Sequence, residues 1–242
     1  MDFTLNKYRE LLDALEHCER VILRHDVDKM PKNSLATAYI ERELGWKATY
    51  YFRIVPESFN PAIILQIASL GHDIGYHYES LATCHGNMET AYRDFCNNLD
   101  KLRSLVPVTS IAMHGSPTSK WDSRELWKYY DYHKLGIDTE PYFDTEFSQI
   151  VYLTDTGRRW DGYKVSVRDK IPEYQEQWEK KGWIYHSTDD IIRAIKLGSF
   201  PERVMINTHP QRWADNKLQW LKELTFQSAK NIVKRLIVSR KP

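Results

Sequence analysis

The sequence reads VILRHDVD at residues 21–28, where a short apolar run passes into a group of charged residues. A run of this kind is typical of a buried strand, because strands covered on both faces are short and continuously apolar. Asp26 and Asp28 follow it two positions apart, so on extended backbone their side chains point the same way. One can hold a metal ion while the other stays free as a base. The stretch therefore predicts a strand with reactive carboxylates at its carboxyl end.

Helical and strand patterns alternate on both sides of this stretch. A helical pattern over residues 2–18 precedes it, and three further helix and strand pairs follow, at 34–44 and 48–54, 61–70 and 72–78, and 88–105 and 110–114. After a region of long loops at 115–182, with short candidate strands at 137–138, 150–153 and 164–167, regular patterns return as a strand at 183–185, a helix at 188–197, a strand at 204–209 and a helix at 215–238. This order predicts an α/β fold with a parallel sheet or barrel.

The composition argues against nucleic-acid binding and against a membrane-spanning protein. The chain of 242 residues has 34 Lys and Arg against 33 Asp and Glu, so no basic field is present to gather nucleic acid. No apolar run approaches the roughly 20 residues of a membrane span, and the first residues lack a signal-peptide pattern, so we expect a cytoplasmic protein. Three scattered cysteines argue against a disulfide framework. Without a Ser-rich or Pro-rich linker, residues 1–242 are expected to form one domain.

Histidines and carboxylates gather at the ends of three predicted strands, in residues 25–28, 72–79 and 207–210. The carboxyl ends of parallel strands lie on one face of a barrel, so these side chains are expected to meet there. Mixed imidazole and carboxylate ligands suit zinc or a similar divalent ion. His72 and His77 point to opposite faces of a regular strand, and His77 is the favoured ligand because it lies nearer the carboxyl end.

Two of these segments resemble the motifs of a known family. RHDVD at residues 24–28 resembles a variant of the first motif of the polysaccharide deacetylases (carbohydrate esterase family 4), and GHDIGYH at 71–77 is similar to the second. The resemblance implies an irregular (β/α) barrel of about seven parallel strands with a bound divalent metal, most simply zinc. It also implies that Asp26 is the catalytic base, that Asp28 and His77 are metal ligands, and that His209 is the general acid. The loop at Trp160 and Asp161 would orient His209.

The sequence departs from the family pattern at the second metal-binding histidine. That position is Leu81, which has no ligand atom. Glu79 on the same strand face as His77, His85 in the following loop, and His114 at the next strand end are the candidates to replace it. The strand ending at His114 also lacks the arginine of the family's third motif. A divergent member of the family is therefore expected.

The resemblance implies a hydrolase of a carbon-nitrogen bond that deacetylates an N-acetylated sugar or polysaccharide precursor. Hydrolysis of another amide or an ester is a second hypothesis, and a barrel that has lost its metal and only binds carbohydrate is a third. The partner in each case is a carbohydrate or a sugar-derived small molecule. Trp121, Trp160 and Trp213 are candidates to stack on sugar faces. In the run at residues 155–161, Arg158 and Arg159 beside Trp160 suit an anionic sugar or a nucleotide diphosphate, and the run is equally compatible with a solvated turn.

Overall fold

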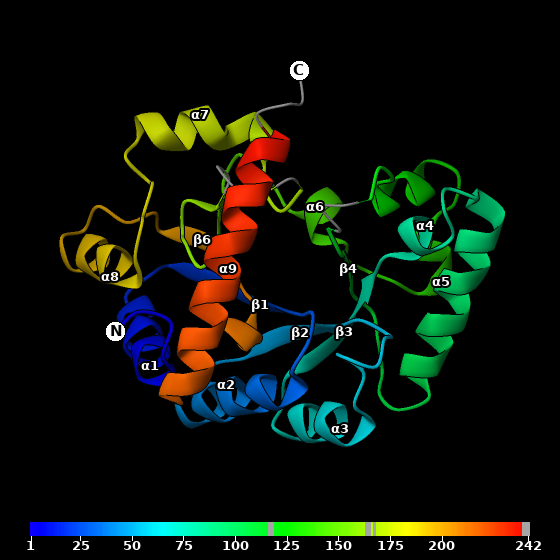
Figure 1. Cartoon of the computed structure of the whole chain (residues 1–242), viewed down its shortest axis with the longest axis horizontal. Helices are drawn as coiled ribbons and strands as arrows, with labels where there is room; N and C mark the ends of the chain where they lie inside the picture. Colours follow the sequence, from blue (N-terminus) through cyan, green and yellow to red (C-terminus); the bar gives the residue numbers. More distant parts are fainter. Residues whose placement is uncertain (116–118, 163–165, 167, 239–242) are drawn as a thin grey trace.

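The computed structural model describes residues 1–115, 119–162, 166 and 168–238. Within them, six parallel strands form one sheet in the order β4-β3-β2-β1-β6-β5, which curls into an open half-barrel with helices around it (Figure 1). The strands are β1 (Arg20–Val27), β2 (Ala48–Phe52), β3 (Asp73–Tyr78), β4 (Ile111–Met113), β5 (Val151–Thr154) and β6 (Arg203–Thr208). The predicted α/β class with parallel strands is therefore confirmed.

The α-helices surround the sheet and follow the strands in sequence. They are α1 (Leu5–Leu15), α2 (Pro31–Glu43), α3 (Pro61–Ser69), α4 (Ser80–Thr83), α5 (Met88–Arg103), α6 (Pro141–Asp144), α7 (Pro172–Lys180), α8 (Thr188–Lys196) and α9 (Lys217–Val238). Short 3-10 turns are η1 (Ser123–Lys128), η2 (Tyr132–Leu135) and η4 (Pro210–Arg212). No helix in the described part of the chain is long and apolar enough to cross a membrane.

Side-chain caps fix where several helices begin. The Asn60 side chain accepts a hydrogen bond from the Ile63 amide before α3, and Asn87 does the same for Thr90 before α5. At α8, Ser187 and Asp190 form a reciprocal capping box. These contacts satisfy amide groups that a helix leaves free in its first turn, so the helix starts are encoded locally.

The structure differs from the prediction in the number of strands and in the region 115–182. Six strands are described instead of about seven, and the predicted strand at 137–138 is reduced to a bridge between Thr139 and Ser110 beside β4. Residues 183–185 are not a strand, because β6 takes the place beside β5 directly. The region 115–182 also contains α6 and α7, where the sequence patterns predict loop. The candidate strand at 164–167 lies outside the described residues, except for Ser166, which is not in a strand.

The central strand β1 separates two buried polar groups. His25 points toward the helices, where its Nε2 atom lies 2.7 Å from Glu41 Oε1 on α2 and its Nδ1 atom lies 2.6 Å from Thr208 Oγ1. Arg24 and Asp26 point to the opposite, concave face, as the two-residue period of a strand requires. The buried contacts of His25 therefore hold α2 against β1 and β6, while the alternate residues of β1 remain available to the inside of the half-barrel.

Gly75 in β3 is required by close packing inside the half-barrel. A Cβ atom at this position would collide with the ring of Tyr51 on the neighbouring β2. The Tyr51 hydroxyl in turn lies 2.6 Å from Ser110 Oγ, just before β4. The glycine of the GHDIGYH segment thus allows three neighbouring strands to approach.

Candidate functional site

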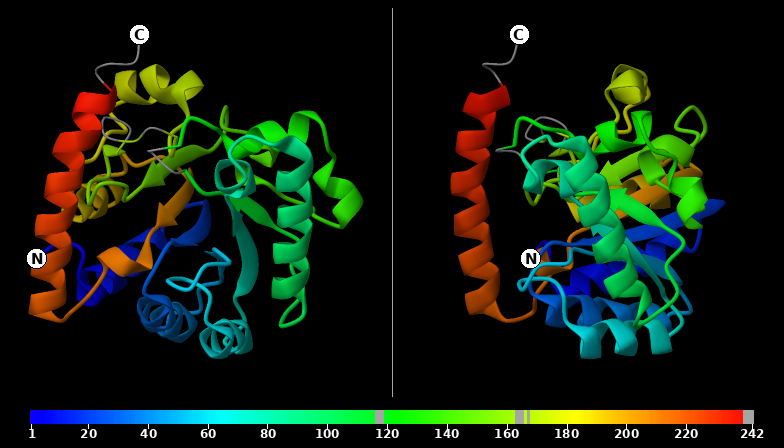
Figure 2. Two further views of the ribbon diagram at one scale, coloured as in Figure 1. Left: turned by 45° about the vertical axis from the view of Figure 1, so that its right-hand side comes forward. Right: turned by 90° about the vertical axis from the view of Figure 1, so that its right-hand side faces the viewer.

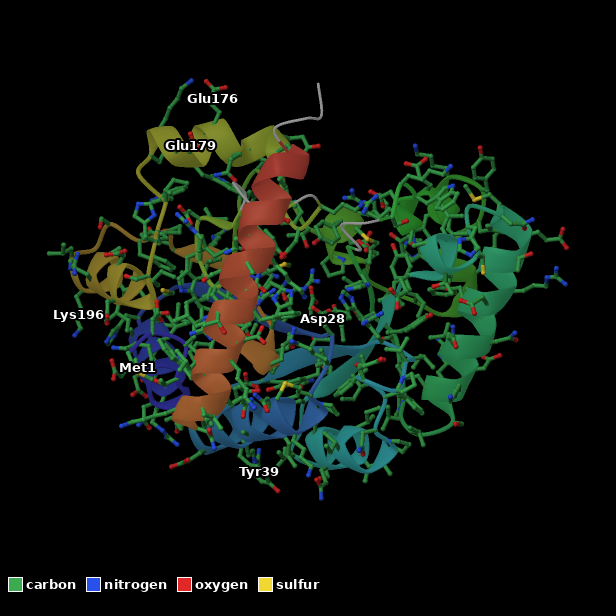
Figure 3. The ribbon with its side chains drawn as sticks, in the orientation of Figure 1. Met1, Asp28, Tyr39, Glu176, Glu179 and Lys196 are labelled. Carbon is green, nitrogen blue, oxygen red and sulfur yellow. The ribbon has the colours of Figure 1, made fainter. Side chains whose placement is uncertain are left out.

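Five of the six strands present a polar side chain at or just beyond their carboxyl ends. Because the strands are parallel, these ends lie on one side of the sheet. The residues are Asp26 and Asp28 at β1, His77 in β3, His114 after β4, Asp155 after β5 and His209 after β6. Asp28 lies near the centre of the molecule (Figure 3). Side chains far apart in the sequence therefore meet at one place.

Asp28, His77 and His114 offer three ligand atoms that all lie within 4.8 Å of one another. Asp28 Oδ1 lies 3.5 Å from His77 Nε2 and 3.6 Å from His114 Nε2. The same Oδ1 atom is buried and has no hydrogen-bond partner among the described residues, which is costly unless a cation or a proton compensates its charge. The arrangement fits one divalent metal ion bound by one carboxylate and two imidazoles.

The other nitrogen of each histidine is already held. His77 Nδ1 lies 2.9 Å from the carbonyl oxygen of Ala112, and His114 Nδ1 lies 2.7 Å from Glu79 Oε2. Such partners fix the ring orientation and leave Nε2 as the free nitrogen, as is usual for metal-binding histidines. Nearby Asp26 and Asp28 outweigh burial and raise the pKa of His77, so a cation at this site competes with a proton.

Asp26 is held as an ionised carboxylate beside the metal cluster. Its Oδ1 accepts a hydrogen bond of 2.8 Å from Arg24 Nη2, and its Oδ2 accepts one of 2.9 Å from Asn207 Nδ2. Burial alone would raise the pKa of Asp26, but Arg24 together with His77 and His209 outweighs it and lowers the pKa below the usual range. Asp26 Oδ2 also lies 3.9 Å from His77 Nε2. Asp26 is thus a negative group at the edge of the cluster that stays charged at neutral pH.

His209 is oriented by Asp155. The Asp155 carboxylate accepts a hydrogen bond from the His209 amide at 3.0 Å, and its other oxygen lies 2.7 Å from His209 Nδ1. It also binds Arg212 Nη1 and Trp213 Nε1, and it is completely buried. The remaining ring nitrogen, Nε2, lies 3.9 Å from Asp28 Oδ2. His209 therefore presents a fixed nitrogen to the same group of residues.

A cavity of about 710 Å³ opens over these residues. Its lining includes Asp26, Asp28, His77, His114 and His209, together with residues of α9. A volume of this size suits a small molecule or the end of a longer chain. A second cavity, of about 750 Å³, opens near the amino ends of the strands and has none of the three clustered ligand residues in its lining. The chemistry-bearing residues therefore select the first cavity.

Glu79 does not join the ligand cluster, contrary to one of the sequence hypotheses. Its carboxylate contacts His114 Nδ1 and forms an ion pair with Arg53, with Nε at 2.9 Å. Burial opposes the charge of Glu79, but His114 and Arg53 outweigh it and lower its pKa to about 2. His85, another candidate, packs beside Trp121 instead of joining the cluster. Of the three candidates that could compensate for Leu81, the structure brings His114 to the cluster.

The hypothesis that tryptophans stack on sugar is not supported by their positions. Trp160 and Trp213 are buried, 3% and 0% exposed, where their indole nitrogens bind Thr188 and Asp155. Trp121 packs on His85 and does not line the cavity among the described residues. Trp160 and Trp213 are instead part of the core, because each buried indole nitrogen finds an acceptor.

The loop at 159–161 is also placed differently from expectation. Asp161 forms an ion pair with Arg159 and lies 3.0 Å from His186 Nδ1 through Oδ2, and Trp160 Nε1 donates to Thr188. The role of orienting His209 belongs to Asp155, which the sequence patterns do not single out. A signal is present in the sequence, because Asp155 directly follows a buried strand. The two ends of the loop 155–161 thus make different contacts, and the end that reaches His209 is Asp155.

Comparisons with known proteins give only distant similarities. No protein-family model matches the sequence, and no curated protein matches it. A family 4 carbohydrate esterase from Bacillus anthracis is similar in structure at 12% identity, with a TM-score of 0.40, over 89% of this chain and 77% of that one. Bacillus subtilis PdaA, a family 4 carbohydrate esterase, is similar at 13% identity with a TM-score of 0.40, over 88% of this chain and 76% of that one. A mutant of the peptidoglycan deacetylase PdaC from Bacillus subtilis is similar at 11% identity with a TM-score of 0.41, over 90% of this chain and 97% of that one.

At these scores the likeness carries no conclusion about this site, whose interpretation rests on its own geometry. The fold and the site together define a parallel α/β half-barrel with an Asp-His-His cluster suited to a divalent cation, flanked by an ionised aspartate and an oriented histidine.

Proposed function

We propose that this protein is a divalent-metal hydrolase that removes the acetyl group from an N-acetylated sugar or sugar-derived precursor. The observation that supports it most directly is the convergence of Asp28 Oδ1, His77 Nε2 and His114 Nε2, all within 4.8 Å of one another. Asp26 and His209 line the same cavity as this cluster. An acid, a base and a cation site in one cavity are the groups that amide hydrolysis requires.

Asp28, His77 and His114 would hold the metal, and their mixed oxygen and nitrogen donors suit zinc or a similar ion. When bound, such an ion polarises a carbonyl group and lowers the pKa of a coordinated water from about 16 toward ~7. Arg53 and Glu79 keep His114 in place, and Ala112 does so for His77. The chain thus supplies both the ligands and the contacts that orient them.

Asp26 takes the role of the base in this proposal. As the water oxygen bonds to the amide carbon, its proton passes to the Asp26 carboxylate, which Arg24 and Asn207 hold in position. His209, fixed through Nδ1 by Asp155, donates a proton from Nε2 to the nitrogen as the carbon-nitrogen bond breaks. The products are acetate and a free amine. Each acid-base group typically contributes ~10²–10⁴-fold to such a rate.

The sugar as substrate class rests on the sequence resemblance, whereas the cavity itself supports only a small molecule or a chain end. The cytoplasmic location proposed from the sequence favours a small precursor over a finished wall polymer. His114 at the cluster also weakens the case for a barrel without metal, because Leu81 was the main argument for that alternative. The buried Leu81 side chain packs among other apolar residues.

Elemental analysis of protein purified without chelator tests the proposal. We expect about one zinc, cobalt, nickel or iron per chain in the wild type, and loss of the metal in Asp28→Ala and His114→Ala. Glu57→Ala is the matched control, since Glu57 lines the same cavity outside the cluster. Acetate release from N-acetylglucosamine and its oligomers is then measured with the loaded protein. Absence of metal after reconstitution, in a folded wild type, would overturn the metallohydrolase proposal.

A further inference from the structure

The long helix α9 forms part of the wall of the cavity that contains the metal cluster. It runs along one side of the molecule in both views of Figure 2. Five of its residues line the cavity, namely Glu223, Phe226, Gln227, Ala229 and Lys230, and Lys29 joins them from the segment after β1. None of these residues contributes to the metal cluster or to the acid-base pair. The α9 wall, defined by these six residues, is therefore available for a different part of the substrate.

Glu223, the acidic residue of this wall, already has a cationic partner. Glu223 Oε2 lies 3.1 Å from Lys29 Nζ. Within the wall itself, Glu223 is thus already paired with Lys29, and among the described residues it is not within ion-pair distance of a further cation.

Lys230 is such a cation. In the described part of the chain it has no acidic side chain within 4.0 Å and no hydrogen-bond partner. Its Nζ atom lies 4.3 Å from the centroid of the Phe226 ring, and Lys29 Nζ lies 5.4 Å from the same centroid. Burial, followed by the positive charge of Lys29, lowers the pKa of Lys230. Lys230 is an exposed residue, and an anion at this position would relieve the repulsion between Lys29 and Lys230.

A second cationic side chain in this cavity also favours an anionic ligand. Arg212 lines the cavity but is only 6% exposed, and its Nε atom has no hydrogen-bond partner in the described part of the chain. Its Nη1 atom donates a hydrogen bond to Asp155, so one edge of the guanidinium group has a partner, whereas its Nε atom has none among the described residues. Arg212 therefore brings a positive charge to the cavity, and a guanidinium group suits a carboxylate or a phosphate.

We propose that the α9 wall is a subsite for an anionic group, a carboxylate or a phosphate, carried by the N-acylated sugar. Lys230 binds the anionic group, and the Arg212 side chain adds positive charge beside it. Phe226, which is 52% exposed, supplies an apolar ring against which the sugar face packs. This inference rests on the proposed function, because it names the substrate class of the same cavity.

Binding measurements with three probes test the subsite. N-acetylglucosamine, N-acetylglucosamine 6-phosphate and N-acetylglucosaminuronic acid are titrated by calorimetry into the metal-loaded wild type, Lys230→Gln and Lys230→Arg. Lys222→Gln is the matched control, because Lys222 is an exposed lysine of α9 outside this cavity. The phosphate and carboxylate arms show which anion the wall takes.

We expect at least one anionic sugar to bind the wild type about tenfold more tightly than the neutral sugar, a size typical of a partly exposed charged hydrogen bond. Lys230→Gln should lose this preference, whereas Lys230→Arg and Lys222→Gln should keep it. In turnover, Lys230→Gln should raise KM for the anionic substrate and leave kcat nearly unchanged. Equal binding of all three sugars, or an unchanged preference in Lys230→Gln, would overturn the inference.

The two proposals fail differently. If the neutral sugar binds as well as the anionic ones and is deacetylated as fast, the hydrolase stands and the anionic subsite falls. If an anionic sugar binds through Lys230 to the metal-loaded protein but no acetate is released, the subsite stands and the hydrolase falls.

Discussion

Glu79 Oε2 accepts a hydrogen bond from His114 Nδ1 at 2.7 Å, which turns the Nε2 atom of His114 toward Asp28. The relationship explains why Glu79 is charged although it is largely buried, since His114 and Arg53 both stabilise its carboxylate. A carboxylate behind a metal-binding histidine fixes the ring and increases its basicity. Glu79 therefore acts on the metal through His114.

Replacing Glu79 should weaken metal binding without abolishing it. In Glu79→Ala we expect the dissociation constant of the metal to rise by about 10–100-fold, as is usual when such an outer partner is removed. Competition with a chromophoric chelator measures this constant. Glu57→Ala, in the same cavity, is the control and should bind as the wild type does. Unchanged affinity in Glu79→Ala would show that His114 is held by other contacts.

Replacing Asp155 should slow the reaction and leave the metal in place. In Asp155→Asn the amide group can no longer hold His209 through a charged hydrogen bond, so the ring loses its orientation. We expect kcat to fall by about 10²-fold or more, with His209→Gln giving a similar loss. Metal content is the second readout, since Asp155 is not one of the three clustered ligands. Loss of metal in parallel with the rate would contradict this assignment.

Because Asp155 is buried and also binds Arg212 and Trp213, the variant must be checked for folding. Circular dichroism and urea unfolding of Asp155→Asn and His209→Gln separate a general loss of structure from a loss of catalysis. His209→Gln leaves Asp155 paired with Arg212, so it is the milder of the two changes.

Removing Arg24 should move the acid limb of the pH–rate profile to higher pH. Burial raises the pKa of Asp26, and Arg24 makes the largest contribution among the groups that together lower it. In Arg24→Gln the buried carboxylate loses this partner, so its pKa rises and the base becomes protonated at a higher pH. The measurement is kcat/KM as a function of pH for both proteins. A profile with an unchanged acid limb would show that Asp26 is not the base.

Glu140 should make the fold less stable as the pH rises. Burial raises the pKa of Glu140 to about 7, even though the amides of Tyr142 and Met113 donate hydrogen bonds to it. The folded state therefore binds a proton more tightly than the unfolded chain, whose pKa at this group is 4.5. The stabilisation from this proton is fully present below about pH 4.5. It decreases as the pH rises above 4.5 and is lost once the pH exceeds the folded-state pKa of about 7. The loss is on the order of 3 kcal/mol.

Urea unfolding of the wild type and Glu140→Gln between pH 5 and 8 measures this effect. The difference in unfolding free energy between the two proteins should shrink as the pH rises, because only the wild type has a proton to lose at this position. We expect Glu140→Gln to be the less stable protein at pH 5, since its single amide oxygen cannot replace both carboxyl oxygens as acceptors, and to depend less on pH. A difference that is constant across this range would exclude Glu140 as the titrating group.

The sequence alone determined the α/β class and most of the regular elements around the site. Helical and strand periods are properties of neighbouring residues, and the caps at Asn60, Asn87 and Ser187 are equally local. The positions of Asp26, Asp28, His77 and His209 at strand ends also followed from the sequence, because parallel strands bring their carboxyl ends together whatever connects them.

The tertiary structure decided which of these residues meet and in what role. His114 and Glu79 are 35 residues apart, and His209 and Asp155 are 54 apart, so their pairing depends on which strands are neighbours in the sheet. The burial of Trp160 and Trp213 and the position of Lys230 on the cavity wall depend in the same way on packing between distant segments. The local sequence determines which side chains stand at the end of each strand. The order of the strands in the sheet determines which of these side chains become neighbours, and that order exists only in the folded chain.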